Sequence, residues 1–488
     1  MPSFDGLSRV LGALAAILGT FAASVYWRAG LSLSHYDAKA HLVVARRVFD
    51  SLTPSWEQFG AVWLPLPHII NAIPVQVDWF YRTGAFAIGV SILSFAITVA
   101  CVSAIVRSLT GSRIGALLAA ALFALNPNVL YLQSTPMTEP LLFALTSLAI
   151  VRLIGWAKSD VPAARPIVGW TIVAACLTRY EAWPIVGAAI VAAAYFKWRN
   201  GLPPIAVIHE AARLTVYPIA TVIFFLGMSF ACTGEWFVTG GFYVPDPKLQ
   251  GQAPAVYQAI RDGLIDLAGS RFVTAMTWAI PILAIAALLK RNWSGLLMPI
   301  ALAASIALPF YAFFSGHPFR IRYEVPLILA GAACIGAAVS LLRFAAPLVA
   351  IPLLFGVILQ ASPFDRGAPM IVEAQLDKNV AGRRAVTACL QRDYDGTTIM
   401  ASMGSLAHYM QELSLAGFDL DDFIHEGSGP IWQRAYYFEP SLFAGWVLVE
   451  EAAEGGDMLY QKQQSWPGFL AAYDRVCEGG NVALYKRR

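Results

Sequence analysis

The sequence predicts a mainly α-helical membrane protein with a small α/β domain at its C-terminal end. Three observations support this prediction: 58% of the 488 residues are hydrophobic, only 13% are charged, and the mean hydropathy is +0.60. A bilayer core takes about 20 apolar residues per helix, and the chain contains many runs of this kind. The formal net charge of +3, without a basic cluster, gives no indication of nucleic-acid binding.

Eleven apolar runs are predicted to cross the membrane as helices, because exposed irregular backbone is too costly in lipid. They cover residues 10–27, 83–107, 114–131, 138–156, 166–178, 183–197, 212–231, 272–289, 295–314, 323–342 and 345–360. The fifth and sixth runs are short and enclose Arg179 and Glu181. One span with Arg179 at its centre would cost about 2.5–3.5 kcal/mol, so two short helices are expected. Arg9, Ala22 and Ala23 also fit a secretory signal, but the many later spans favour a retained first helix.

Charges in the short loops predict the orientation of the chain. Five loops with Lys and Arg, the first beginning at Arg107 and the last holding Arg343, fall on one side of the membrane. The positive-inside rule assigns that side to the cytoplasm. The opposite loops also carry cations, but they are longer or mix in acidic residues. We therefore expect the N-terminus inside, and the 28–82 loop and the C-terminus outside.

From about residue 361 the chain is more polar, and predicted strands alternate with helices. The predicted segments are the strands 398–401, 446–449 and 482–485 and the helix 404–415. This alternation is typical of a small α/β domain. The predicted organisation is a transmembrane domain over 1–360 and a soluble, extracytoplasmic α/β domain over 361–488. Cys389 and Cys477 lie in this outer domain and are expected to form a disulfide, since outer compartments are oxidising.

Charge is concentrated directly after the first apolar run, in the stretch 34–50 with the sequence SHYDAKAHLVVARRVFD. As a helix, this stretch has an apolar stripe formed by Leu42, Ala45, Phe49 and Leu52. Such a helix is expected to lie in the plane of the membrane interface, with Asp37 at its start. Structural alternatives stay open: Ser34 and Asp37 fit a capping box, Lys39 fits contact with anionic lipid, and His41 fits a helical pair with Asp37.

With this topology, polar residues from five separate stretches are expected at the outer face of the membrane. They are Asp37, Lys39 and His41; Trp63, Pro65 and His68; Thr138 and Glu139; Arg179 and Glu181; and His317, Arg320, Arg322 and Tyr323. Ionisable residues at a membrane are costly to keep, which makes them candidates for function. The last stretch places its basic residues close together beside a tyrosine, and arginines suit the binding of phosphate oxygens.

Structural explanations also fit four of these stretches. His68 lies between prolines and apolar residues, so a packing role is slightly favoured. Glu139 precedes a proline at a helix start, where a carboxylate complements the helix dipole. Arg179 and Glu181 fit a simple ion pair. The last stretch fits an interfacial belt of cations and an aromatic residue, although its concentration of bases favours anion binding.

One acid among several cations at a membrane face predicts group transfer from a lipid phosphate. When a sugar leaves a polyprenyl phosphate, cations stabilise the charge that develops on the phosphate, and Arg320, Arg322, Lys39 and Arg179 are the candidates. Asp37, as general base, removes the proton of an acceptor hydroxyl as it attacks the anomeric carbon. One base is sufficient for direct displacement with inversion, and the two flanking carboxylates of glycosidases are not evident.

Five short motifs extend over residues 10–345: HYDAKAHLVVARRVF, GAVWLPLPHII, STPMTEPLLFAL, LTRYEAW and HPFRIRYEVPLI. Together with the topology they resemble the GT-C superfamily of polytopic glycosyltransferases, near the protein O-mannosyltransferases and the aminoarabinose transferases that modify lipid A. The resemblance implies that Asp37 is the catalytic base and that Arg322 and Tyr323 help to bind the lipid phosphate.

The resemblance further implies a sugar donor linked to polyprenyl phosphate and a glycan, lipid or protein acceptor. It implies a multi-pass protein of the bacterial inner (plasma) membrane that acts in cell-envelope glycan biosynthesis. Many members of the superfamily have a second acid directly after the first, where this chain has Ala38. No cofactor is assigned on this basis, and a divalent cation stays open, with Glu139 as a candidate ligand from another loop.

Two other classes of protein remain as alternatives. A transporter or flippase of lipid-linked sugars is expected to keep polar groups near the membrane midplane and to show repeat symmetry. Here the predicted charges collect at one face, and no repeat is evident. A sensor or scaffold whose outer domain alone matters would not need eleven spans. The sequence therefore favours an enzyme of the glycosyltransferase class.

Overall fold

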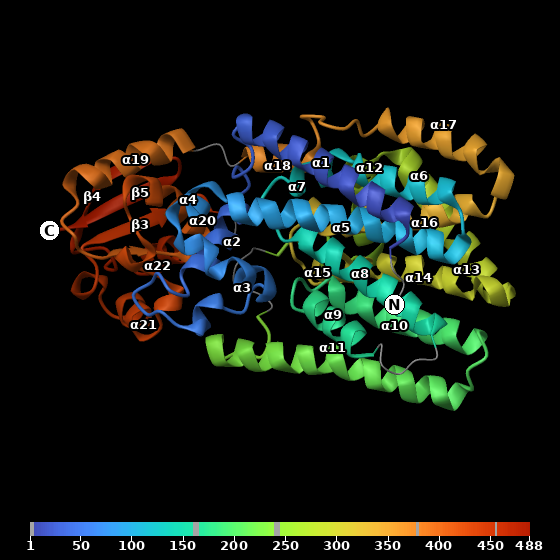
Figure 1. The fold of residues 1–488 in the computed structure, drawn as a ribbon. Coiled ribbons are helices and arrows are strands. Elements are labelled where there is room, and N and C mark those ends of the chain that lie inside the picture. The colour runs from blue at the N-terminus through green and yellow to red at the C-terminus, as the bar shows by residue number, and fades with distance from the viewer. Residues whose placement is uncertain (1–3, 160–164, 239–244, 377–379, 454–455) are drawn as a thin grey trace. The chain divides into compact units, whose positions relative to one another are not determined.

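The computed structural model describes residues 4–159, 165–238, 245–376, 380–453 and 456–488, drawn as a ribbon in Figure 1. The fold is mainly helical (71%) with one small C-terminal sheet, which confirms the predicted fold class. Contacts divide the chain into two compact units. Unit 1 combines Met1–Ala29, Ile88–Phe225 and Asp246–Val372, and unit 2 combines Gly30–Ala87, Leu226–Pro245 and Glu373–Arg488.

All eleven predicted apolar runs fall on helices. The α-helices that lie wholly or mostly in unit 1, together with α18 at its boundary, are α1 Gly6–Arg28, α5 Ala85–Thr110, α6 Arg113–Ala124, α7 Pro127–Leu132, α8 Glu139–Lys158, α9 Arg165–Cys176, α10 Ala182–Arg199, α11 Pro204–Thr233, α12 Ala253–Ala268, α13 Ser270–Leu289, α14 Leu297–Ile300, α15 Ala307–Phe314, α16 Pro326–Ser340, α17 Ala346–Ile358 and α18 Pro369–Leu376. Among the described residues, seven helical segments are long and apolar enough to cross a membrane. This composition is that of a multi-pass membrane protein.

Fewer helices qualify as spans than the eleven predicted, and in one case a local cap is the reason. The predicted run 114–131 is two helices, because the Asn126 side chain accepts hydrogen bonds from the backbone nitrogens of Asn128 and Val129 and Pro127 begins α7. Its first part, Arg113–Ala124, is one of three apolar helices shorter than a span; the others are Pro166–Cys176 and Arg343–Ile358. An apolar run in the sequence therefore marks a helix here but does not fix its length.

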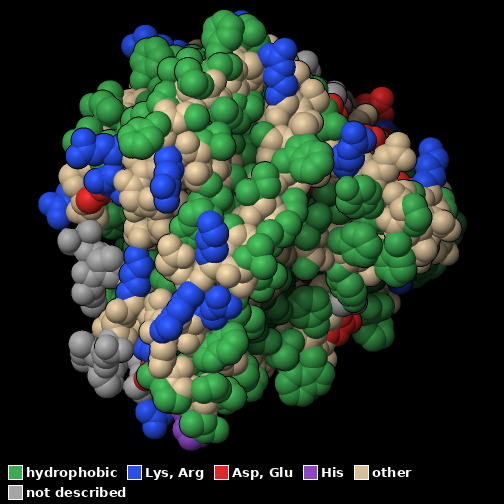
Figure 2. All heavy atoms as spheres, turned by 90° about the vertical axis from the view of Figure 1, so that its right-hand side faces the viewer, with side chains coloured by type: hydrophobic (Ala, Val, Ile, Leu, Met, Phe, Trp, Pro, Cys, Tyr) green, Lys and Arg blue, Asp and Glu red, His purple; other side chains and the backbone are tan. Residues whose placement is uncertain are grey.

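Two glycines bring α6 and α16 close together inside unit 1. A Cβ atom on Gly115 would collide with the backbone oxygen of Gly336, and a Cβ atom on Gly336 would collide with that of Gly115. Small residues of this kind let membrane helices approach closely. The face in Figure 2 is largely hydrophobic, with Lys and Arg side chains scattered over it and few acidic ones.

Unit 2 contains a five-stranded sheet with the strand order β2-β1-β3-β5-β4. The strands are β1 Ile399–Ala401, β2 Phe423–Ile424, β3 Trp446–Glu450, β4 Tyr473–Gly479 and β5 Val482–Arg487, and the C-terminal helices are α19 Val380–Asp393, α20 Met403–Leu413, α21 Pro430–Tyr437 and α22 Met458–Ser465. β1 is parallel to β2 and β3, whereas β5 is antiparallel to β3 and β4. The three predicted strands and the predicted helix are confirmed; β2 and β4 are additional.

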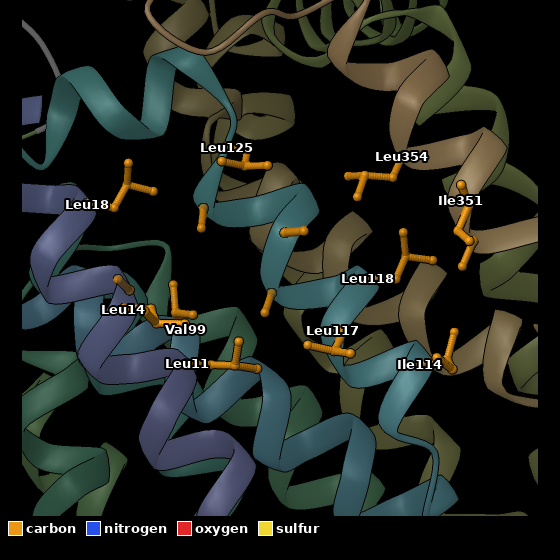
Figure 3. Close-up of a pocket in the computed structure, with 15 residues that line it drawn as sticks. Leu11, Leu14, Leu18, Val99, Ile114, Leu117, Leu118, Leu125, Ile351 and Leu354 are labelled. Atoms are coloured by element: carbon orange, nitrogen blue, oxygen red, sulfur yellow. The ribbon is translucent and has the colours of Figure 1, made fainter. Parts of the chain in front are cut away.

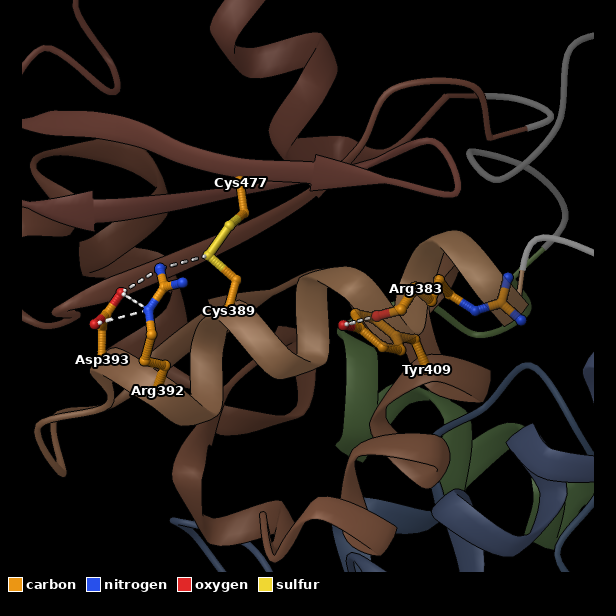
Figure 4. The surroundings of a disulfide bond; sticks show 6 residues. All are labelled: Arg383, Cys389, Arg392, Asp393, Tyr409 and Cys477. Carbon is orange, nitrogen blue, oxygen red and sulfur yellow. Dashed lines mark hydrogen bonds and ion pairs between the residues drawn. A yellow bond between two sulfur atoms is a disulfide. The ribbon is translucent and has the colours of Figure 1, made fainter.

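The predicted disulfide is confirmed. Cys389 of α19 and Cys477 of β4 are bonded (Figure 4). The bond ties a helix to the strand at one edge of the sheet.

The segment after the first helix folds as part of unit 2. It forms α2 Tyr36–Arg46, α3 Leu66–Ala72 and α4 Asp78–Thr83. Leu42, Val43 and Tyr81 from this segment share one hydrophobic core with Leu406 and Met410 of α20. The predicted division at residue 360 follows the order of the chain, whereas this compact unit joins segments from opposite ends of it.

α2 differs from the helix predicted over 34–50. It ends at Arg46, so Phe49 and Leu52 lie beyond it, and the predicted stripe along one helix is wrong. All residues from Ala38 to Arg46 are buried, because α20 and other elements of unit 2 pack against α2. The apolar spacing in the sequence reflects burial on several sides and not one exposed face.

The structure shows which residue caps the start of α2. His35 is the N-cap, and its Nδ1 accepts a hydrogen bond from the Asp37 backbone nitrogen at 3.1 Å. Ser34 Oγ instead donates to the Gly30 carbonyl oxygen at 2.9 Å. His35 thus takes the N-cap position that the capping-box alternative gave to Ser34, and Asp37 is the second residue of α2.

Candidate active site

A buried ion-pair cluster in unit 1 brings together two of the predicted stretches. Glu139 begins α8, and Arg179 lies in the turn between α9 and α10. Arg179 Nη1 is 2.9 Å from Glu139 Oε1, and Arg179 Nη2 is 2.7 Å from Glu181 Oε1. Arg179 Nη1 also donates to Thr138 Oγ1 at 3.0 Å. Since Arg179 Nε donates to Glu181 as well, every nitrogen of this guanidinium contacts a protein oxygen.

Arg322 joins this cluster from a third stretch. It lies in the short 3₁₀ segment Ile321–Glu324 before α16, and its Nε is 3.5 Å from Glu139 Oε1. Glu139 is 0% exposed and Arg322 is 9% exposed. Cations close by stabilise a buried carboxylate. Arg179 and Arg322 do so for Glu139, and its carboxylate in turn restrains both arginines.

His317 and Tyr323 contact each other beside the cluster. The Tyr323 hydroxyl is 3.3 Å from His317 Nε2, and His317 Nδ1 is 2.7 Å from the Pro318 carbonyl oxygen. With Nδ1 donating to that carbonyl, Nε2 of a neutral imidazole accepts from the tyrosine. Arg320 is half-buried at the start of the same segment. The stretch from His317 to Tyr323 is therefore an ordered group of basic and hydroxyl side chains.

The predicted base and the residues nearest to it lie in unit 2. Asp37 is half-buried in the first turn of α2, where the helix dipole favours a carboxylate. Lys39 is 7% exposed, and its Nζ is 2.6 Å from Glu412 Oε1 of α20. The Lys39 ammonium is thus paired with a carboxylate of the C-terminal segment.

His41 and His68 form a pair of buried rings. His41 Nδ1 is 3.0 Å from His68 Nε2, and the Trp63 ring centroid is 4.2 Å from that of His41. Burial, with a smaller effect of Arg47, lowers the pKa of His68 to about 3. His68 is therefore uncharged at neutral pH, which supports the packing role that the sequence slightly favoured.

The predicted residues thus form two groups, one in each unit. Asp37, Lys39, His41 and His68 lie in unit 2, and those of the other three stretches lie in unit 1. Among the residues that the structure describes, no group of three or more His, Cys, Asp or Glu side chains fits a metal ion.

The sequence did not point to two residues of the C-terminal segment, Arg383 and Glu412, that form an ion pair. Arg383 of α19 contacts Glu412 through Nε to Oε2 at 2.8 Å and Nη2 to Oε1 at 2.9 Å. Glu412 thereby pairs with both Arg383 and Lys39. No motif marks either residue, because the contact with Lys39 spans 373 positions of the chain.

An apolar cavity of about 380 Å³ is open at the surface of unit 1 and is lined in part by exposed side chains such as Leu14 and Ile351. Figure 3 shows leucine and isoleucine side chains from α1, α6 and α17 around it. Every lining residue is aliphatic or alanine. A cavity of this composition accepts hydrocarbon and provides no contact for a polar ligand.

The fold and the topology define a class, that of multi-pass membrane proteins with a helical unit and an interleaved α/β unit. No family model and no curated protein matches the sequence. Solved structures do match. The crystal structure of ArnT from Cupriavidus metallidurans bound to undecaprenyl phosphate is similar, with a TM-score of 0.59 and 13% sequence identity over 96% of this chain and 97% of that chain.

The structure of the same ArnT in the apo state is similar to the same extent, with a TM-score of 0.58 and 13% identity over 96% and 97% of the two chains. ArnT is a GT-C glycosyltransferase. The fold that the sequence resemblance implied is therefore confirmed over nearly the whole chain.

Proposed function

We propose that this protein is an integral membrane glycosyltransferase that moves a sugar from a polyprenyl-phosphate donor to an acceptor hydroxyl. The observation that carries the proposal is the fold, which is shared over 96% of the chain with an ArnT structure that holds undecaprenyl phosphate. The apolar helices and the aliphatic cavity of unit 1 are consistent with a donor that has a long hydrocarbon tail.

Asp37 is the proposed general base. Its carboxylate takes the proton of the acceptor hydroxyl while the hydroxyl oxygen bonds to the anomeric carbon. The bond from that carbon to the phosphate oxygen breaks, and polyprenyl phosphate leaves as an anion. A single displacement of this kind inverts the anomeric configuration. The half-buried position of Asp37 at a fixed helix start supports this role.

The proposed phosphate ligands are Arg320 and Arg322, with His317 and Tyr323 beside them. Arginine suits this task because its planar fork matches phosphate oxygens. Glu139 contacts Arg322 and Arg179, and we assign it the role of orienting Arg322.

In unit 2, His41 is proposed to contact the sugar, and His68 holds its ring in place through the 3.0 Å contact between them. Lys39 faces Glu412, so no donor contact is assigned to it. The Cys389–Cys477 bond supports placing unit 2 at the outer face of a bacterial inner membrane.

The replacement Asp37→Asn tests the proposed base. It keeps the shape of the side chain and removes its ability to take a proton. Transfer of sugar from a purified polyprenyl-phosphate donor is expected to fall by about 10²–10⁴-fold, the usual contribution of a general base. Donor affinity, measured by competition with polyprenyl phosphate, should stay unchanged.

The matched control is Asp474→Asn, since Asp474 is exposed in the same unit and pairs only with Arg488 among the ion pairs that the structure describes. Equal activity of the two variants would show that Asp37 is not the base. Loss of donor binding in Asp37→Asn would point instead to a structural role.

A further inference from the structure

One face of α20 lies against the first turn of α2, within unit 2. Gly404, His408 and Glu412 are spaced four residues apart and therefore share that face. The Tyr36 hydroxyl donates to the Gly404 carbonyl oxygen at 2.7 Å, and the Tyr36 and His408 ring centroids are 4.7 Å apart. The C-terminal segment thus contacts the residue directly before Asp37.

Lys39, two residues after Asp37, is held by the last residue of this face. Its Nζ is 2.6 Å from Glu412 Oε1. Lys39 is 7% exposed, so the ion pair is shielded from water and geometrically restricted. Contacts from α20 therefore lie on both sides of Asp37 in the sequence of α2.

Glu412 is in turn fixed by Arg383. Two nitrogens of this guanidinium contact the two Glu412 oxygens, at 2.8 and 2.9 Å, and this bidentate geometry restricts the carboxylate in orientation as well as position. Burial opposes the ionisation of Glu412, but Arg383 and Lys39 outweigh it and lower its pKa to about 2. Glu412 is therefore ionised at neutral pH and attracts both cations.

Arg383 has a rigid support. It lies in α19, the helix that the Cys389–Cys477 bond ties to β4, and Tyr409 Oη donates to its carbonyl oxygen at 3.1 Å (Figure 4). The chain of contacts therefore runs from the disulfide-bonded α19 through Arg383, Glu412 and Lys39 to the start of α2.

We propose that Glu412 is a positioning residue for the transfer reaction, acting through Lys39 to hold Asp37 in place. The inference rests on the proposed function of Asp37. It gives the C-terminal α/β part of the chain a role in positioning Asp37, although this part lies far from Asp37 in the sequence. Lys39 serves this arrangement as a structural cation and does not bind the donor phosphate.

The test uses three variants of the full-length enzyme: Lys39→Met, Glu412→Gln and the double variant. Lys39→Met keeps the aliphatic stem and leaves Glu412 paired with Arg383, so no buried charge loses its last partner. Each single variant is expected to lower kcat by about 10- to 100-fold, the effect of displacing a reacting group by about 1 Å. KM for the donor should change by less than about twofold, since donor binding is not involved.

The double variant should be no slower than the slower single variant, because both changes break the same contact. Lys39→Arg, which keeps the ion pair, should restore most of the turnover. Glu451→Gln is the matched control, since Glu451 pairs with Arg475 and has no described contact with α2. Its kcat and thermal midpoint should equal those of the unmodified enzyme.

Three outcomes would overturn the inference. They are a Glu412→Gln enzyme as fast as Glu451→Gln, losses in the double variant that multiply, and a raised donor KM in Lys39→Met alone. The last outcome would assign Lys39 to the phosphate. Failure of the proposed base is separate, because it would appear as an active Asp37→Asn enzyme whatever the Glu412 variants do.

Discussion

Glu139 is enclosed in unit 1 between the guanidinium groups of Arg179 and Arg322, and water does not reach it. Removing one partner of a buried ion pair commonly costs about 3–5 kcal/mol, because a charge is left uncompensated. Under the proposed function, a mutation of Arg322 therefore has two separable effects: the loss of the proposed phosphate contact and the loss of a partner for Glu139.

Arg322→Ala is expected to weaken donor binding by about 10-fold or more, which corresponds to one lost hydrogen bond to a charged group. Glu139→Gln removes the carboxylate that orients Arg322 and should weaken donor binding, but less than Arg322→Ala does. The combined variant Glu139→Gln, Arg322→Ala decides between the two effects in a competition assay with polyprenyl phosphate. Weak binding in the combined variant is expected; recovery of normal affinity would show that Arg322 only serves Glu139.

Three buried histidines belong to different elements of unit 2. His68 lies in α3, His408 in α20 and His425 directly after β2. Burial lowers the pKa of each to about 3, with a smaller effect of Arg47 on His68 and His425 and of Arg383 on His408. The folded state therefore keeps all three rings uncharged over a pH range in which the unfolded chain would protonate them.

Because each folded pKa lies below the unfolded value of about 6.5, the unfolded chain binds more protons at acidic pH. The contribution of these uncharged rings to the free energy of unfolding is therefore fully present above about pH 6.5. It decreases as the pH falls toward 3, by up to about 1.4 kcal/mol for each histidine and each pH unit. Thermal unfolding of the protein in detergent should show a midpoint that falls steadily from pH 7 to pH 5.

His408→Gln should reduce this pH slope, since it removes one of the histidine contributions. His209→Gln is the control, because His209 is exposed on α11. A slope that is the same in both variants would exclude the buried rings as its cause.

The two compact units are interleaved along the chain. Unit 2 takes the segment after the first helix, the segment around the end of α11 and the C-terminal segment, while unit 1 takes the three segments between and before them. A unit assembled in this way cannot be removed by truncation at one point. The segment that carries Asp37 and the C-terminal sheet are therefore expected to be lost or retained together.

Accessibility labelling tests the predicted topology of the whole molecule. In a Cys232→Ser background, Glu57→Cys and Ser315→Cys are expected to react with a membrane-impermeant maleimide in intact spheroplasts. Arg113→Cys should react only after permeabilisation, because its loop carries the positive-inside signal. All three positions are exposed. If Glu57→Cys and Ser315→Cys reacted from different sides, the two groups of candidate residues would not act on one substrate.

Much of the fold was predictable because the signals are local. Apolar runs mark every helix that was expected, and the alternation of short strands and helices marks the C-terminal sheet. The same signals failed where a local cap or a tertiary contact decided the outcome. Asn126 and Pro127 split one predicted run. α20 packs against α2, so the residues of α2 from Ala38 to Arg46 are all buried and do not form the predicted single stripe.

The sequence by itself determined the class of the protein, the stretches that concentrate charge and the two cysteines that pair, because composition and spacing carry that information. Only the tertiary structure decided which charged residues pair with one another. Glu139 lies between two arginines from separate loops, and Lys39 pairs with a glutamate 373 positions away. Ion pairs act over a few ångströms in space, and nothing in the order of the residues encodes which distant charges the fold brings to that distance.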